Sequence, residues 1–237
     1  MNINELIKGI LPRNVDYLVG LANLTGLLPE RYRGYDYAIV LARRLDDRII
    51  NNIADGPNMD YFNHYHEVNA ELTHVAHSLA DAISAQGSKS QVIEPTFHDK
   101  DINESYSQTL RTNFSHKMAA TRAGLGWIGK TALFVSWQFG PRVRLVTVLT
   151  DYPLPYCPEP IDESKCGSCN LCMRECPAKA ANGKLWNIHV DRDEFFDAFA
   201  CRKKARELSL NILNKEISLC GKCIAVCPIG KKKKSQA

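Results

Sequence analysis

The residues with the clearest chemical potential are cysteines. The chain has nine, and eight of them lie between Cys166 and Cys227. They form two runs, Cys166-x2-Cys169-x2-Cys172-x3-Cys176-Pro177 and Cys220-x2-Cys223-x3-Cys227-Pro228. Thiolates are soft donors that suit iron, and the first run has the spacing with which three cysteines ligate one cluster while the fourth ligates another. The pattern therefore predicts two [4Fe–4S] clusters.

Two clusters need eight thiolates, and the second run is one short. Its first position is occupied by Ile217, and Cys201 is the natural replacement from an upstream helix. The prediction for the first cluster, here cluster A, is ligation by Cys166, Cys169, Cys172 and Cys227. The prediction for the second, cluster B, is ligation by Cys176, Cys201, Cys220 and Cys223.

Two alternatives accompany this assignment. Cys157 is predicted to be a spare free thiol, and it is also the other candidate for the position given to Cys201. Zinc competes with iron, because C-x2-C pairs bind zinc as well.

Composition restricts the classes of protein to consider. The 237 residues are 45% hydrophobic and 24% charged, which is typical of a globular protein and excludes disorder or coiled coil as the main structure. No apolar run approaches the roughly 18 residues of a membrane span, and no secretory signal is visible. We therefore expect a cytoplasmic protein with no membrane partner, in which crowded cysteines bind metal and do not form disulfides.

The charge is unevenly distributed. Residues 161–237 hold 15 Lys and Arg against nine Asp and Glu, whereas residues 1–160 hold 15 against 17. Clusters with four thiolates are anionic, so the basic excess is expected to offset them, and a nucleic-acid partner is not expected. The lysine run at 231–234 is interpreted as part of a solvated tail.

Hydrophobic patterning predicts the elements that hold these residues. We expect helical pieces over 4–28, helices over 61–86 and 115–123, and strands over 35–42 and 91–95. Strands over 132–137 and 143–149 are predicted to form a hairpin, with Arg142 and Arg144 exposed. The predicted organisation is an α/β domain over 1–155, a ferredoxin-like dicluster domain over 156–230 and a basic tail over 231–237.

A glycine-rich loop lies at residues 124–131, with the sequence GLGWIGKT. It fits the patterns of both the nucleotide phosphate loop and the dinucleotide-binding turn. Both motifs need a strand before the glycines and a helix after them. Here the helix-like segment comes first and the strand-like segment second, so the pattern argues against ATP and NAD.

Residues 115–130, SHKMAATRAGLGWIGK, resemble the A-x-x-A-G-L-G-W-x-G-K segment of epoxyqueuosine reductases, a family related to the reductive dehalogenases. Those proteins also carry a dicluster module with a lone cysteine between the two runs, as Cys201 is here. The resemblance covers about residues 100–230. It implies a nitroreductase-like N-terminal domain that holds a corrinoid, cobalamin, beside one cluster. It also implies an electron donor such as ferredoxin or flavodoxin.

The same resemblance suggests site residues around the loop. The cofactor-binding candidates are Gly124, Leu125, Gly126, Trp127, Gly129 and Lys130. His116 and Lys117 are the candidates for proton delivery or cofactor contact.

One departure from the family concerns its proton-donating aspartate. Gapless alignment places Leu110 at that position, and the nearest acidic residues are Glu104 and Asp101. We therefore expect a short paralogue, an oxidoreductase whose clusters deliver electrons to a corrinoid or a corrinoid protein. The alternatives are a non-catalytic dicluster electron carrier that docks a protein partner, and queuosine tRNA modification by epoxide reduction.

Overall fold

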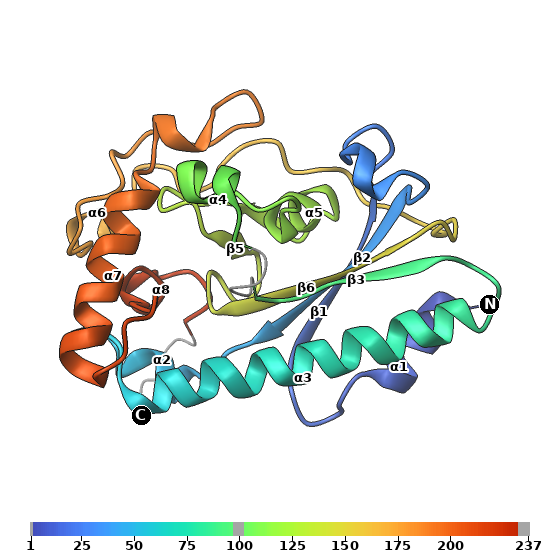
Figure 1. The fold of residues 1–237 in the computed structure, drawn as a ribbon, viewed down its shortest axis with the longest axis horizontal. Helices are drawn as coiled ribbons and strands as arrows, with labels where there is room; N and C mark the ends of the chain where they lie inside the picture. Colours follow the sequence, from blue (N-terminus) through green and yellow to red (C-terminus); the bar gives the residue numbers. More distant parts are fainter. Residues whose placement is uncertain (1, 97–101, 232–237) are drawn as a thin grey trace. The chain divides into compact units, whose positions relative to one another are not determined.

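The computed structural model describes residues 2–96 and 102–231 (Figure 1). The chain divides into two compact units, each assembled from three separate segments. The first contains the N-terminal segment up to Arg44, Glu67–Leu125 and Arg144–Ile161. The second contains Leu45–His66, Gly126–Val143 and the segment that starts at Asp162. Both helices and strands contribute, so the predicted α/β class is confirmed.

The first unit is built on a four-stranded sheet with the order β1-β2-β6-β3. The strands are β1 (Tyr17–Asn23), β2 (Tyr37–Arg44), β6 (Val143–Thr150) and β3 (Ser90–Ile93). β1 is antiparallel to β2, and β3 is antiparallel to β6. Residues 38–42 of β2 are all buried, which explains the uninterrupted apolar run there. The strands predicted at 35–42 and 91–95 are confirmed.

Helices lie on both sides of this sheet (Figure 1). The long helix α3 (Met59–Ser84) runs along one side, where Glu71 accepts hydrogen bonds from Tyr17 (2.6 Å) and Arg43 (3.3 Å). The helix α5 (His116–Arg122) packs on β1 and β2 from the other side. Gly20 of β1 permits this approach, because an added Cβ would lie 2.6 Å from the Cβ of Ala123. The helices predicted at 61–86 and 115–123 are therefore confirmed.

Shorter elements complete the first unit. The helix α1 (Ile3–Ile10) begins after Asn2, whose side chain accepts hydrogen bonds from the backbone N–H groups of Asn4 and Glu5. A 3₁₀ turn covers Glu30–Tyr32, and α4 covers Glu104–Thr109.

The second unit holds the cysteine-rich segment and a small hairpin. The hairpin pairs β4 (Gly126–Ile128) with β5 (Phe134–Ser136). The helices are α2 (Asp47–Asn51), α6 (Leu171–Arg174), α7 (Ala198–Leu213) and α8 (Lys222–Val226), with a 3₁₀ turn at Arg192–Glu194. α8 packs against both α2 and α6. Phe195 is buried against Ile128 and Ala132, which joins the hairpin to the cysteine-rich segment.

Two predictions about residues that form strands in the structure were wrong. The segment 4–28 is not wholly helical, because residues 17–23 form β1 and satisfy their backbone groups by pairing with β2. The predicted hairpin between 132–137 and 143–149 does not form, because β5 pairs with β4 whereas β6 lies in the four-stranded sheet. The intervening turn packs elsewhere: a Cβ on Gly140 would lie 2.0 Å from the carbonyl oxygen of Ile229.

None of the helices in the described part of the chain is long and apolar enough to cross a membrane.

The hairpin leaves no room for a side chain at Gly126, where an added Cβ would lie 2.0 Å from the Val135 carbonyl oxygen. Gly126→Ala should therefore lower the free energy of unfolding by about 2–3 kcal/mol through overpacking. Gly9→Ala is the control, because Gly9 is an exposed helical residue with nothing within 4 Å of an added Cβ. It should raise stability by up to about 1 kcal/mol. Anaerobic urea unfolding followed by circular dichroism measures both, and equal stabilities would contradict the packing.

Candidate metal centre

One cysteine of each run lies on a short helix, and these two helices pack against each other. Cys172 is within α6, and Cys223 is within α8. Cys227 ends α8 in an extended conformation, and Pro228 follows, which prevents the helix from continuing. Cys201 comes from the first turns of α7. Three separate segments of the chain thus present thiols within one compact unit.

The four thiols predicted to ligate cluster A are neighbours in the structure. Burial, together with the neighbouring thiols of Cys166, Cys172 and Cys169, raises the pKa of Cys227 to about 11. Burial also raises the pKa of Cys172, with added contributions from Cys166 and Cys169.

The second set of neighbours matches the prediction for cluster B. Burial, together with the thiols of Cys176 and Cys220, raises the pKa of Cys201 to about 11. Burial likewise raises the pKa of Cys223 far above its ordinary value, with contributions from Cys220 and Cys201 and a smaller one from Cys172. The two sets therefore adjoin at Cys172 and Cys223.

The structure also bears on the two alternatives, a role for Cys157 as a ligand and a zinc site. Cys157 lies in the first unit, and its pKa is raised by burial alone. Within residues 2–96 and 102–231, no three His, Cys, Asp or Glu side chains converge as ligands of a single metal ion.

Three side chains of the glycine-rich loop point to the cysteines. Trp127 donates its indole N–H to the Sγ of Cys166 at 3.3 Å. The side chain of Thr131 hydrogen-bonds Cys223, which lowers the pKa of that thiol against the effect of burial. The role of Thr131 was missed in the sequence, where it counted only as the last position of a phosphate-loop pattern.

Lys130 is the third of these side chains, and it is only 4% exposed. Its Nζ donates to the carbonyl oxygens of Gly167 (2.9 Å) and Cys169 (3.0 Å) and to the Oδ1 of Asn170 (2.7 Å). These three bonds use the three donors of an ammonium group. Lys130 therefore clamps the loop between the first two ligands predicted for cluster A.

The glycines of the loop are explained by local packing. Gly124 has φ +67° and follows α5, where its N–H donates to the Thr121 carbonyl oxygen. A Cβ on Gly129 would lie 2.9 Å from a methyl group of Val135 and 3.6 Å from the Sγ of Cys166. The helix α5 comes before the loop and β4 after it, which is the reverse of the order in nucleotide-binding loops. This order is the one predicted from the sequence, and the argument against ATP and NAD binding rests on it.

Arg142 is a structural residue that sequence reasoning missed. It is fully buried, whereas an exposed position was predicted. It donates to Asp47 (2.8 Å) and Asn51 (2.9 Å) of α2 and to the Ala225 carbonyl oxygen (3.3 Å) of α8. Arg142 therefore ties α2 to the helix that carries Cys223, and no local sequence signal marks this long-range contact. Arg144 is also not exposed: it is half-buried and donates to Asn69 (2.9 Å) and to the Pro95 carbonyl oxygen (2.9 Å).

His116, a candidate for proton delivery, has both ring nitrogens engaged inside the first unit. Its Nε2 donates to the Glu94 carbonyl oxygen (2.9 Å), so its Nδ1 accepts from the Thr147 hydroxyl (2.8 Å). Burial lowers its pKa from 6.5 to about 4, and the nearby charges of Arg144 and Lys117 favour the neutral ring as well. This geometry supports a structural role and gives no support to proton delivery. Lys117 is half-buried on the next position of α5.

The structure also describes the segment in which the family's proton-donating aspartate is expected. Leu110 ends α4 with φ +52°, and Glu104 begins that helix. Asp101 lies outside the described residues. The leucine side chain has no acidic proton to donate.

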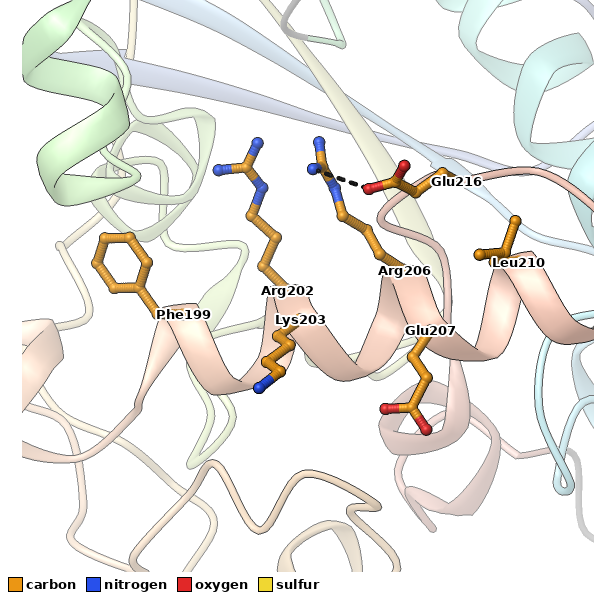
Figure 2. A pocket seen from close by; sticks show the side chains of 7 residues that line it. All are labelled: Phe199, Arg202, Lys203, Arg206, Glu207, Leu210 and Glu216. Carbon is orange, nitrogen blue, oxygen red and sulfur yellow. Dashed lines mark hydrogen bonds and ion pairs between the residues drawn. The ribbon is translucent and has the colours of Figure 1, made fainter.

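An open hollow of about 480 Å³ lies along α7, the helix that carries Cys201 (Figure 2). Figure 2 shows Arg202 and Arg206 on one side of the helix, with Arg206 paired to Glu216 at 3.5 Å. Phe199 and Leu210 are each 48% exposed at its edges. The hollow is a mixed charged and apolar surface on the helix that would support cluster B.

Comparison with protein families identifies residues 165–230 as a 4Fe-4S double cluster binding domain. The predicted pair of [4Fe–4S] clusters is therefore confirmed. Among curated proteins, the chain is 31% identical over 116 residues to an epoxyqueuosine reductase of Listeria monocytogenes, covering 46% of this chain and 28% of that enzyme. It is 32% identical over 123 residues to the tetrachloroethene reductive dehalogenase of Sulfurospirillum multivorans, covering 47% of this chain and 23% of the other. The aligned part thus spans less than a third of either relative.

Solved structures share the fold. A catabolic reductive dehalogenase in complex with 3-bromo-4-hydroxybenzoic acid matches 99% of this chain and 32% of its own, with a TM-score of 0.72 and 19% identity. An epoxyqueuosine reductase from Bacillus subtilis matches 99% of this chain and 66% of its own, with a TM-score of 0.58 and 18% identity. The predicted resemblance to these two groups is confirmed.

The buried neutral state of His116 makes stability depend on pH. Because its folded pKa of about 4 lies below its ordinary value of 6.5, stability is complete above that value and is lost as the pH falls below it. At about pH 5.5 the loss from this group should reach about 1.4 kcal/mol relative to neutral pH. His116→Gln should remove this part of the pH dependence, as measured by anaerobic urea unfolding at both values. His189→Gln, at an exposed position, is the control and should behave as the unaltered protein does.

Proposed function

We propose that this chain, which resembles epoxyqueuosine reductases and reductive dehalogenases, transfers single electrons through two [4Fe–4S] clusters to an acceptor held by its first unit. The observation that carries the proposal is the grouping of eight thiols into two adjoining sets. A ferredoxin or a flavodoxin is the class of donor we propose, and the cytoplasm is the proposed location.

The residues of the second unit fit the clusters. Buried thiols with raised pKa values would repel one another as thiolates, and bound iron supplies the positive charge that stabilises them. We assign Cys166, Cys169, Cys172 and Cys227 to cluster A. We assign Cys176, Cys201, Cys220 and Cys223 to cluster B. Cys157 takes no part in this assignment.

The protein's own groups hold this assembly in place. Lys130 fixes the backbone between Cys166 and Cys169, and Arg142 anchors α8. Because Cys172 and Cys223 adjoin, an electron passing from one cluster to the other would cross a short distance with no movement of the protein. When bound, the clusters supply one-electron chemistry, and these residues supply its geometry.

The acceptor that we propose is a corrinoid in a nitroreductase-like first unit. The support is similarity. The chain resembles a tetrachloroethene reductive dehalogenase in sequence, and its fold resembles that of a reductive dehalogenase whose structure suggests a mechanism for B12-dependent dehalogenation. The residues do not by themselves define a corrinoid site, since the polar groups of Trp127 and Lys130 serve the cysteine loops.

Two alternatives remain as outcomes of the tests. A dicluster carrier that docks a protein partner needs the same clusters and no corrinoid, and the exposed hollow on α7 is compatible with such docking. Epoxide reduction on tRNA is favoured by the epoxyqueuosine reductase relatives, one of which was solved with a tRNA stem loop. Leu110 at the position of the proton donor argues against that reaction.

The ligand assignment predicts different results for the two cysteines outside the main runs. Cys201→Ser should lose cluster B or leave it incomplete, with iron falling from about eight per chain toward about four. Cys157→Ser is the matched control and should keep both clusters. Iron and sulfide analysis with EPR of the reduced, reconstituted protein measures this. If Cys157→Ser lost a cluster and Cys201→Ser did not, the assignment of Cys201 would be wrong.

The corrinoid proposal predicts a change in the EPR spectrum of cob(II)alamin. Titrated with the cluster-loaded protein under anaerobic conditions, cob(II)alamin should change to a base-off signal, because a folded site would replace its own lower ligand. Cob(II)alamin in buffer alone is the control. An unaltered spectrum beside intact cluster signals would favour the carrier. Binding of tRNA with a steep salt dependence would favour the tRNA reaction.

A further inference from the structure

The glycine-rich loop has hydrogen-bond donors for both sets of thiols. Trp127, in β4, donates to Cys166 at 3.3 Å, and the two side chains belong to the same compact unit. The Trp127 side chain is only 2% exposed, so water does not compete for its indole N–H. This bond reaches a ligand assigned to cluster A.

Four residues later, Thr131 reaches the other set. Its side chain is 8% exposed and hydrogen-bonds Cys223, a ligand assigned to cluster B. A thiolate bound to iron has no proton to give, so the hydroxyl of Thr131 donates to it. One short loop thus supplies a separate donor to each cluster.

Lys130 lies between these two donors and completes the environment of cluster A. It is buried, and its Nζ donates to the carbonyl oxygens of Gly167 and Cys169 in the cysteine loop. A buried cation and a buried N–H donor both favour negative charge on the nearby thiolates. Cluster B receives the neutral hydroxyl of Thr131 from the same loop.

Resting on the proposed function, we propose that the glycine-rich loop sets the reduction potentials of the two clusters separately, with Trp127 raising that of cluster A and Thr131 that of cluster B. Each cluster gains one electron from a ferredoxin-class or chemical reductant, which makes it more negative by one charge. A hydrogen bond to a ligand sulfur stabilises the more negative form, so it raises the reduction potential. Burial strengthens the effect because the local dielectric is low.

The test is an anaerobic EPR redox titration of reconstituted protein with dithionite. Trp127→Phe keeps an aromatic ring but removes the N–H, and it should lower the midpoint of cluster A while that of cluster B stays unchanged. Thr131→Val keeps the shape but removes the hydroxyl, and it should lower the midpoint of cluster B alone. Thr131→Ser restores a hydroxyl and should restore most of the potential. The signals are assigned to the clusters with the Cys201→Ser variant.

The outcomes separate this inference from the proposed function. Iron analysis before each titration shows whether both clusters are present; failure of the unaltered protein to hold two clusters would overturn the proposed function, and this inference with it. Two intact clusters with unchanged midpoints in both variants would overturn this inference alone. Equal shifts of both midpoints in each variant would also overturn it, because a general loosening of the fold would act on both clusters.

Discussion

Eight thiols crowded into one small unit impose the strongest physical constraint on this protein. Burial raises the pKa values of Cys201, Cys223 and Cys227, and the neighbouring sulfurs raise them further. The deprotonated, thiolate form of such crowded thiols is poorly stabilised unless positive charge is bound among them. Two iron–sulfur clusters satisfy that requirement, and much of the second unit is arranged to keep the sulfurs in position for them.

The surrounding contacts show how that arrangement is maintained. The short helices α6 and α8 pack together and carry Cys172 and Cys223. Arg142 bonds α8 to α2, although it lies more than 80 residues away from Ala225 in the sequence. Lys130 bonds the loop between Cys166 and Cys169. Buried cations therefore hold the backbone of the cysteine segments, and this is a reason for basic residues that does not involve nucleic acid.

The glycine-rich loop illustrates how one motif can match several patterns and serve a different purpose. Its glycines fit the nucleotide-binding consensus, yet Gly126 and Gly129 are needed because the backbone and side chain of Val135 lie against them. Its lysine has its donors committed to the cysteine loop. The loop thus acts as part of the surroundings of the metal centre, and the order of helix and strand around it already argued against a phosphate site.

The sequence by itself determined the chemistry of the second unit, because the spacing of cysteines within a run is a local property that dictates which corners of a cluster the run can reach. It also determined β2, α3 and α5, whose apolar patterns are continuous or periodic. Only the tertiary structure decided which strands pair, since β5 and β6 have similar apolar character but join different sheets. The burial of Arg142, the bonds of His116 and the meeting of Trp127 and Thr131 with the cysteines were likewise decided there. Each of these contacts joins residues far apart in the chain, and no local pattern records which distant partner will satisfy a buried polar group.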